Sequence, residues 1–469
     1  MNRDTLKTKD KPFRLAPSQS IIAGFALMIF VGALLLNLPI ASKSGEGVGF
    51  LDALFTAASA SCVNGLTVVN TMEHWTWFGK TVLLVLTQFG ALGLVTILTA
   101  AMLLTQHHIT LRNRQAIQAS FNQESIGGID KFVKNVVLIT VAFEFAGALL
   151  LAVCFRADAS MAGWESVYQG VFHSISAFCN AGFDNLGVDS LIKFRNNAPI
   201  NFIIIILTVA GGLGFPVLIE TGRFLKNPHK RSLRQRLIHL SLHAKIVYVI
   251  TGALILTGTA LFLLFEWYNP DTLGDLPLFQ KLQAALFQSV MLRTTGFSTI
   301  SQNGLAEESQ FVSCVLMIIG GSSAGTAGGV KTITVGVLFF SMVSLLKGRA
   351  NLEAFGRSLP LDLLQKSLTV VSTMCVVVFT TVILLCLSEQ TNPFQHTFLD
   401  LLFETCSAAG TVGMNIGITP HLSPAGKIIL IVCMYLGRLS PAAVVIALNA
   451  RLHNNAGGIS YPEERVIIG

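Results

Sequence analysis

The chain reads Ser-Ala-Ser-Cys-Val-Asn-Gly-Leu at residues 59–66, and the glycine of this stretch returns three times in similar settings. The four glycines are Gly65, Gly182, Gly296 and Gly413, separated by 117, 114 and 117 residues. Because a spacing this regular is typical of internal repeats, it indicates four copies of one structural unit.

The four copies agree position by position around the glycine. Thirteen residues before it, where a short helix is expected to begin, stand Asp52, Gln169, Gln283 and Asp400; ten before stand Phe55, Phe172, Leu286 and Phe403; six before stand Ser59, Ser176, Val290 and Ser407; one after stand Leu66, Phe183, Phe297 and Met414. The pattern predicts a half-membrane helix that the glycine ends, followed by an extended return. Four unrelated interfacial helices that merely end at glycine would leave this shared register unexplained.

The composition places the chain in a membrane. It is 52% hydrophobic and only 12% charged, which is outside the range of ordinary soluble domains. Apolar stretches that can cross a hydrocarbon core of about 30 Å recur at residues 20–41, 78–105, 135–155, 200–222, 246–267, 311–346, 367–388 and 426–449. The predicted fold is an all-α polytopic membrane protein, with four tandem helix, pore loop, helix repeats and eight transmembrane helices around one central pore.

The expected boundaries follow from these stretches: a tail at 1–19, repeat 1 at 20–106, repeat 2 at 107–222, repeat 3 at 223–347, repeat 4 at 348–450 and a tail at 451–469. Most of the 32 Lys and Arg lie in the two tails and in the loops 112–134, 223–245 and 347–366. The positive-inside rule then predicts a multi-pass protein of the cell membrane with both termini cytoplasmic. Basic loops beside anionic lipid account for the net charge of +7, so no nucleic acid partner is expected.

Two further readings of the sequence are less favoured. The first apolar stretch could be a signal peptide, but it is longer than the roughly 7 to 15 residues of a signal core. The eight cysteines show no paired spacing and lie almost entirely in apolar segments, so they predict buried apolar side chains without a metal site or a disulfide framework.

The segments at the four glycines predict a site for a cation. Four half-helices that converge on one axis would aim their C-terminal ends, each with roughly half a negative charge, at the membrane centre. Backbone carbonyls there can replace the hydration shell of a cation, as they do for K⁺ in potassium filters, and no organic cofactor is expected. The predicted filter residues are Cys62, Val63, Asn64, Gly65, Cys179, Asn180, Ala181, Gly182, Thr294, Thr295, Gly296, Thr411, Val412 and Gly413. Arg293 is charged, so we expect it to point away from the axis and to tether the pore loop.

Several motifs together resemble the Trk, Ktr and HKT superfamily of potassium transporters. They are the four glycine segments, Gly211-Gly212-Leu213-Gly214-Phe215-Pro216, Leu240-Ser241-Leu242-His243, Arg293-Thr294-Thr295-Gly296-Phe297 and Gly410-Thr411-Val412-Gly413. The likeness covers nearly the whole chain. Trk subunits carry two extra helices before the first repeat, so the bacterial Ktr membrane subunit is the closer match. Plant relatives that prefer sodium often have serine at the first filter position, so glycine at all four positions implies potassium.

A glycine-rich break in the sixth apolar stretch predicts a gate. A helix facing lipid cannot contain so many small and polar residues, so the segment is expected to lie across a water-filled cavity below the filter, and the resemblance implies an intramembrane gating loop. The predicted gate residues are Gly320, Gly321, Ser322, Ser323, Gly325, Thr326, Gly328, Gly329 and Lys331, together with Arg438 in the last span. The alternative is a tight helix-packing face.

Three ionisable residues at membrane depth need partners or water. The resemblance places Arg438 beside the pore below the filter, where its charge could impede ions; a structural ion pair with a carboxylate such as Glu404 is the alternative. For Glu144 a structural role is expected.

The resemblance also implies partners. No stretch outside the spans is long enough for a nucleotide-binding domain, so a separate cytosolic ring that binds adenine nucleotides is expected at the loops 106–134 and 223–245 and the tail 450–469. A homodimer with two pores is expected as well. Coupling to Na⁺, or activation by it, leaves no signature in the sequence.

The predicted function is therefore potassium translocation as the membrane subunit of a Ktr-type uptake system, not an enzyme. A Trk-like or sodium-permeable cation channel is the alternative, and a secondary transporter of a small organic solute is a distant one. A hydrolase that uses His173 and Ser174 is disfavoured, because neighbouring residues on a helix point in different directions.

Overall fold

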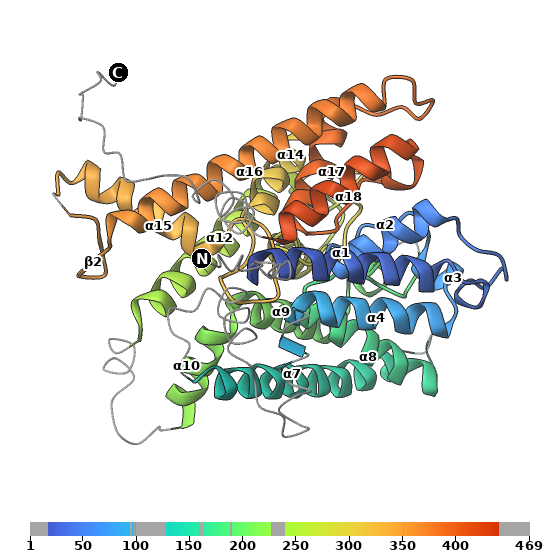
Figure 1. The fold of residues 1–469 in the computed structure, drawn as a ribbon, viewed down its shortest axis with the longest axis horizontal. Helices are drawn as coiled ribbons and strands as arrows, with labels where there is room; N and C mark the ends of the chain where they lie inside the picture. The colour runs from blue at the N-terminus through green and yellow to red at the C-terminus, as the bar shows by residue number, and fades with distance from the viewer. Residues whose placement is uncertain are drawn as a thin grey trace, which may run out of the picture.

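The computed structural model describes residues 17–93, 96–97, 99, 128–158, 161, 163–187, 190–226, 240–349 and 351–439. Within these ranges the regular backbone is almost entirely helical, and the named strands form one hairpin, β1 (Glu353–Ala354) with β2 (Arg357–Ser358). Many of the long helices run side by side along the long axis of the molecule (Figure 1). The chain is therefore a mostly helical protein, as predicted.

The helices follow one another in four groups, each with a first helix, a short helix and a last helix. The groups are α1 (Pro17–Leu36), α2 (Phe50–Ser61) and α4 (Trp77–Leu92); α7 (Ile129–Ala157), α8 (Trp164–Phe178) and α9 (Ala198–Leu213) with α10 (Phe215–Lys226); α12 (Leu242–Glu266), α13 (Leu278–Met291) and α14 (Glu307–Ile318) with α15 (Thr332–Leu346); and α16 (Leu361–Ser388), α17 (Phe398–Gly410) and α18 (Pro424–Arg438). Short helical pieces connect the helices within the groups: α3 (Thr71–His74) and three 3₁₀ turns at Pro39–Ala41, Ile192–Phe194 and Thr419–His421.

The groups pack in a closed circle. The last helix of each group contacts the short helix of the next group: α4 contacts α8, α9 contacts α13, α14 contacts α17, and α18 contacts α2. The final contact joins the end of the chain to its beginning. Lys427 of α18 forms an ion pair with Asp52 of α2 at 2.6 Å, and the Tyr435 hydroxyl donates to the carbonyl oxygen of Ile22 at 2.7 Å. All four short helices are therefore held around one centre.

Length and apolar composition agree with a helical membrane protein. Three described helices, α7, α12 and α16, can cross a membrane by these two criteria, and the bent pair α9 and α10 is a fourth candidate if it is one span. Shorter apolar helices lie at Ile21–Leu36, Trp77–Leu92 and Thr332–Leu346. The predicted stretches 78–105 and 426–449 run into residues outside the described ranges, so the number of eight spans stays a prediction.

A sharp bend divides the predicted span 200–222. Helix α9 ends at Leu213, and the chain turns by 107° into α10. Gly214 at the turn has φ +89°, a backbone angle that glycine accepts and other residues rarely adopt. The amide of Phe215 then donates to the carbonyl oxygen of Ala324 at 2.9 Å instead of continuing the helix.

All four short helices end earlier than predicted, and two of them also begin earlier. They end at Ser61, Phe178, Met291 and Gly410, three to five residues before the repeated glycine instead of at it. Asp52 and Asp400 lie in the first turn of their helices as expected. Gln169 and Gln283 lie deeper, because α8 and α13 begin earlier, and their side-chain amides donate to the carbonyl oxygens of Asn185 and Arg195 at 2.9 and 3.1 Å.

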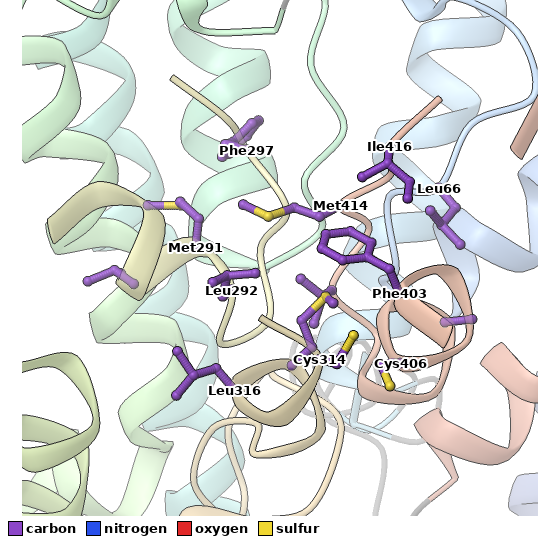
Figure 2. Close-up of a cluster of buried hydrophobic side chains, with 14 of the residues drawn as sticks. Leu66, Met291, Leu292, Phe297, Cys314, Leu316, Phe403, Cys406, Met414 and Ile416 are labelled. Atoms are coloured by element: carbon purple, nitrogen blue, oxygen red, sulfur yellow. The ribbon is translucent and has the colours of Figure 1, made fainter. Parts of the chain in front are cut away.

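The apolar positions of the repeated pattern form the core around the four glycines. The residues that follow them, Leu66, Phe183, Phe297 and Met414, are all buried, and so are Phe55, Phe172 and Phe403. Figure 2 shows Phe403, Met414 and Leu66 gathered in this core beside side chains from the third group. The large apolar residue after each glycine is therefore a core residue.

Two carboxylates connect the end of a first helix to the start of a last helix. Glu389, directly after α16, accepts from the amide and hydroxyl of Ser423, the N-cap of α18, at 3.1 and 2.6 Å. Glu266, at the end of α12, accepts from the amide of Ala306, the N-cap of α14, at 3.0 Å. Both side chains are buried. They satisfy amides at helix N-termini, which have no partner within their own helix.

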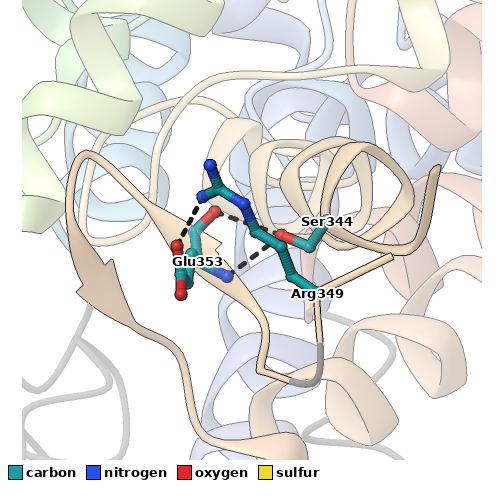
Figure 3. A network of polar contacts seen from close by, with 3 residues as sticks. All are labelled: Ser344, Arg349 and Glu353. Carbon is teal, nitrogen blue, oxygen red and sulfur yellow. Dashed lines mark hydrogen bonds and ion pairs between the residues drawn. The ribbon is translucent and has the colours of Figure 1, made fainter. Parts of the chain in front are cut away.

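The hairpin follows α15 and is fixed to its end. The Ser344 hydroxyl accepts from the amide of Glu353 at 3.0 Å and donates to its carbonyl oxygen at 3.3 Å, and Arg349 forms an ion pair with the Glu353 carboxylate (Figure 3). These contacts set the position of the hairpin relative to α15.

Candidate ion pathway

The four segments before the repeated glycines share an unusual backbone. We call residues 62–65, 179–182, 293–296 and 411–413 the glycine segments. Each ends in a glycine with positive φ: 97° at Gly65, 70° at Gly182, 76° at Gly296 and 88° at Gly413. Two residues earlier a residue with a side chain also has positive φ: 57° at Val63, 60° at Asn180, 130° at Thr294 and 53° at Thr411. Alternating left- and right-handed residues turn successive carbonyls to the same side, as an ion-binding strand requires.

The glycine segments lie in a closed ring. A Cβ added to any of the four glycines would lie less than 3 Å from the carbonyl oxygen of the residue before the next glycine: Gly65 meets Ala181, Gly182 meets Thr295, Gly296 meets Val412, and Gly413 meets Asn64. These contacts return to their starting point after four steps. The ring therefore brings four backbone carbonyls together, and no side chain larger than hydrogen fits at the glycines.

Serine side chains of the short helices form hydrogen bonds with the backbone at three of the glycine segments. Ser59 and Ser407 accept from the amides of Gly65 and Gly413, each at 3.1 Å. Ser176 donates to the carbonyl oxygen of Phe183 at 2.7 Å. The third copy has Val290 at this position, and the amide of Gly296 instead donates to the carbonyl oxygen of Met291 at 3.1 Å. The serine of the repeated pattern is thus a support for the ring.

The side chains of the segments bond to the surrounding helices. The Asn64 amide donates to the carbonyl oxygens of Ser407 and Ala408 at 3.2 and 3.1 Å, at the end of α17. Asn180, oriented so that both ends of its amide are satisfied, donates to the carbonyl oxygen of Ala177 at 3.1 Å and accepts from Thr294 at 2.7 Å. Cys62 and Cys179 are free thiols buried in the protein. The ring interior is therefore left to backbone groups.

A polar cavity of about 370 Å³ lies against one side of the ring. All four glycines line it, and so do Asp184 and several side-chain amides and hydroxyls. Asp184 is the acidic residue among the described lining residues. The cavity can hold a cation with part of its water shell before it meets the carbonyls.

The predicted gating loop lies against the other side, and its two ends are joined. The amide of Gly320 donates to the carbonyl oxygen of Val330 at 3.0 Å, that of Val330 to Ile318 at 3.0 Å, and that of Thr332 to Gly321 at 2.9 Å. We call residues 318–321 and 329–332 the neck of the loop, and residues 322–328 its middle. The neck is fixed by its own backbone bonds, which a sequence of glycines does not predict.

The middle of the loop is bonded to the bend between α9 and α10. The amides of Ser322 and Thr326 donate to the carbonyl oxygens of Gly212 and Gly211 at 2.7 and 3.2 Å, and the Thr326 hydroxyl donates to that of Phe178 at 3.1 Å. Gly328 packs directly on the side chain of Thr411 in the fourth glycine segment. The loop thus spans from the second group to the fourth, directly beneath the ring. Of the other predicted gate residues, Ser323 and Gly325 lie in the middle close to Gly214, and Gly320, Gly321, Gly329 and Lys331 lie in the neck.

Arg438 holds the middle of the loop. Its guanidinium donates to the carbonyl oxygen of Thr326 at 2.6 Å and to those of Gly90 and Ala91 at the end of α4. The alternative ion pair with Glu404 is not found in the described structure, where Glu404 instead accepts from the Thr419 hydroxyl at 2.9 Å. Arg438 therefore joins the loop to the first group through backbone carbonyls.

Three further charged side chains near the ring form hydrogen bonds with neighbouring groups. The Lys331 ammonium donates to the carbonyl oxygen of Ala327 at 2.6 Å. Arg293 donates to the carbonyl oxygen of Gly320 and to the Thr332 hydroxyl, both at 3.1 Å. Its tether thus runs to the neck of the gating loop. Glu144 accepts from the Gln88 amide at 3.3 Å, which joins α7 to α4.

Three close approaches were not apparent from the sequence. Gly90, Gly211 and Gly437 of the last helices pack on the carbonyl oxygens of Ser61, Phe178 and Ala409, near the ends of the short helices. No side chain fits there, so these glycines let the last helices approach the ring. A single glycine in an apolar helix is a weak signal; their similar distance from the repeated glycine was the available clue.

A ring of convergent backbone carbonyls inside an apolar helical protein, with a loop beneath it, defines the class of membrane proteins that transport cations. The family model described as TrkH, cation transport protein, matches residues 5–455. The chain belongs to this family, within the Trk and Ktr superfamily, and is not an enzyme. In agreement with this, His173 and Ser174 bond to different backbone carbonyls, those of Gln169 and Glu144.

The relatives include potassium uptake proteins. The chain is 37% identical to Ktr system potassium uptake protein B of Bacillus subtilis over 459 residues, which is 97% of each chain. It is 36% identical to the potassium/sodium uptake protein NtpJ of Enterococcus hirae, covering 99% of this chain and all of that one. The crystal structure of the potassium transporter TrkH from Vibrio parahaemolyticus aligns with a TM-score of 0.70 at 18% identity, over 95% of this chain and 86% of that one.

Proposed function

We propose that this chain is the potassium-translocating membrane subunit of a Ktr-type uptake system, and that the ring of glycine segments is its selectivity filter. The observation that carries the proposal is the closed ring of four carbonyls with the same alternating backbone in each segment. Carbonyl oxygens in such a ring replace the hydration shell of K⁺. The C-terminal ends of α2, α8, α13 and α17 point their negative dipole ends toward the same place, which favours a cation.

Sodium permeation is the second candidate function. One relative is named for potassium and sodium uptake, and it matches the chain over its full length. We favour potassium because all four ring positions are glycine, so that no side chain narrows the ring. Sodium coupling would show as a potassium flux that depends on external sodium, and isotope flux with and without sodium measures it.

Substitution of the ring glycines tests the filter. Serine at Gly182 would place its Cβ against the carbonyl oxygen of Thr295, in a backbone angle that opposes any side chain. We expect Gly65→Ser, Gly182→Ser, Gly296→Ser and Gly413→Ser each to weaken the preference for potassium. Rubidium uptake with sodium as competitor, in cells without other potassium uptake systems, measures this preference.

Gly45 provides a matched control. It has φ +74°, similar to Gly182, but a Cβ there would meet nothing within 4 Å. Gly45→Ser should therefore keep the parental preference while carrying a similar backbone penalty. An unchanged preference in all four ring variants would show that the ring is not the filter.

We further propose that residues 320–331 and Arg438 form the gate. The middle of the loop lies beneath the ring and is held by Arg438 from one side and by the bend between α9 and α10 from the other. Removal of either contact would free a glycine-rich segment that has little helical preference of its own. In the open state the middle of the loop is displaced from beneath the ring. The guanidinium of Arg438 moves with it and no longer repels cations in the pathway.

The assembly and orientation are also proposals. Relatives named as parts of Ktr systems support a soluble partner, for which we propose a cytosolic nucleotide-binding ring, with a homodimer of this chain in the membrane. Both termini are proposed to be cytoplasmic, with the cavity that Asp184 lines facing outward. Labelling of Lys43→Cys by an impermeant thiol reagent in intact cells would support this orientation, and labelling only after lysis would contradict it.

A further inference from the structure

The third glycine segment is supported differently from the other three. Val290 stands where the other copies have a serine, so no hydroxyl reaches the backbone of this segment from α13. The amides of Thr294, Thr295 and Gly296 share one acceptor, the carbonyl oxygen of Met291, at 3.3, 3.0 and 3.1 Å. The angle φ of Thr294 is 130°, whereas the three equivalent residues have values between 53° and 60°. The short helix α13 therefore holds this segment through backbone acceptors, without the side-chain hydroxyl that the other copies have.

Arg293 supplies the support that the serine provides elsewhere. It is the first residue of the third segment and is buried. Its guanidinium donates to Gly320 and Thr332, one on each side of the neck of the gating loop. The Thr332 hydroxyl also donates to the carbonyl oxygen of Gly320 at 3.1 Å, which joins the two acceptors to each other. Hydrogen bonds from a charged donor are among the stronger ones in proteins.

The neck is suited to act as an anchor because it is held together independently of the middle. Three backbone hydrogen bonds connect its two strands, and Ile319 and Val330 form a parallel bridge. Gly320 packs against the methyl group of Thr294, so the neck also contacts the segment directly. The hydrogen bonds that Arg438, Gly211 and Gly212 form with the loop all go to its middle, and Gly212 also packs on Gly321 of the neck.

A cavity of about 20 Å³ lies beside Arg293, lined also by Thr251, Thr208 and Asn180. This is enough for one water molecule between polar groups. The Nε atom of Arg293 has no protein partner among the described residues, and a water there would supply one. The site is thus built to keep a buried guanidinium in place without a carboxylate.

We propose that Arg293 is a specificity-determining residue that fixes the third segment of the ring to the neck of the gating loop. The two arginines then have separate tasks on one loop: Arg438 holds the middle, which moves, and Arg293 uses the neck, which does not. Loss of Arg293 frees the carbonyls of the third segment, and the ring discriminates less well between potassium and sodium. The inference rests on the proposed filter and gate.

The test uses variants of the full-length protein and compares two quantities: the preference for potassium over sodium, and the unaided flux, which is the potassium flux without a soluble partner. Arg293→Gln should lower the preference for potassium over sodium about tenfold, equivalent to about 1.4 kcal/mol. Arg438→Gln is the matched control: it removes the other arginine that bonds to this loop, and it should raise the flux measured without a soluble partner while leaving the preference unchanged. Thr332→Val keeps Arg293 and the side-chain volume but removes one acceptor, and it should lower the preference by a smaller factor.

A compensating substitution separates anchoring from general damage. Val290→Ser places a hydroxyl where the other copies have one, so Arg293→Gln with Val290→Ser should regain part of the lost preference. An unchanged preference in Arg293→Gln and Thr332→Val overturns the inference, and so does a double variant that regains nothing. If Arg438→Gln leaves flux unchanged while Arg293→Gln loses preference, the proposed gate fails and the role of Arg293 stands.

Discussion

At the scale of single residues, Glu389 shows how burial and hydrogen bonding compete at one carboxylate. Burial acts to raise the pKa of Glu389, but hydrogen bonds from Ser423, Asn392 and Ser388 together outweigh it and lower the pKa below the ordinary value. A carboxylate with a lowered folded-state pKa adds stability above its unfolded value of about 4.3. This contribution is lost as the pH falls through the lower folded-state value.

We therefore predict that Glu389→Gln lowers the free energy of unfolding of the detergent-solubilised protein near neutral pH. The expected loss is about 1 to 3 kcal/mol, because the carboxylate is buried and accepts several hydrogen bonds. The variant should also lose less stability than the parent below about pH 4.3. Thermal unfolding followed between pH 7 and pH 3 measures both effects.

Asp362→Asn is the control for this prediction. Asp362 pairs with Lys366 on an exposed helix surface, where such pairs contribute about 1 kcal/mol or less. If Glu389→Gln unfolds like Asp362→Asn across the whole pH range, the connection between α16 and α18 does not depend on the charge of Glu389.

The residues of the ring also show what the sequence reveals about a site. The glycines, and the serines six positions before them, could be predicted because the same local backbone needs them in each copy. The partner of Asn64 could not, since the residues it bonds to, Ser407 and Ala408, lie more than 340 positions away. That contact depends on the order of the four groups around the ring, which no single repeat encodes.

At the scale of elements, we expect substitutions in the neck and in the middle of the gating loop to have different effects on transport. Replacement of residues 322–327 by two glycines keeps the neck, and with it both acceptors of Arg293, but removes the bonds to Arg438 and to the α9 to α10 bend. We expect unaided potassium flux to rise severalfold in proteoliposomes, with the preference for potassium retained.

The same replacement combined with Gly182→Ser is the control, because flux through the ring should then lose its preference for potassium. A shortened protein that inserts normally, yet conducts no faster than the parent, would identify residues 322–327 as a packing element. The gate would then lie elsewhere in the protein.

The two interrupted helices differ in how visible they are in the sequence. The break between α14 and α15 was predicted because five glycines in ten positions cannot sustain a helix. The bend at Gly214 was not predicted. Gly211, Gly212 and Gly214 each cost a helix about 1 kcal/mol relative to alanine, and Pro216 is tolerated in the first turn of a helix, so the long apolar run as a whole still predicts one span. Its cause is tertiary: Phe215 bonds to Ala324 of the loop.

At the scale of the whole molecule, the proposed regulation concerns segments outside the ring. The basic loops predicted as docking surfaces fall largely outside the described residues. The names of relatives point to a multi-subunit uptake system. A separate soluble subunit is therefore the proposed source of regulation.

We predict that potassium uptake through this chain in native membranes depends on a co-purifying soluble subunit and responds to adenine nucleotides. The measurement is rubidium flux in vesicles with the subunit removed and then added back. The variant with two glycines in place of residues 322–327 is the control, since its flux should no longer need the subunit. Equal flux with and without the subunit in the parent protein would contradict the prediction.

The order of the four groups in one chain also affects how such a protein can change over generations. In a channel assembled from four identical subunits, one mutation alters every position of the ring at once. In this protein a mutation in one codon alters only one of the four positions of the ring. The residue that contacts each glycine can also change independently of the other three. Val290 is an example, since one unit has valine where the other three have serine. With the ring as the proposed filter, ion preference can thus be adjusted in small inherited steps, each of which leaves three quarters of the ring unchanged.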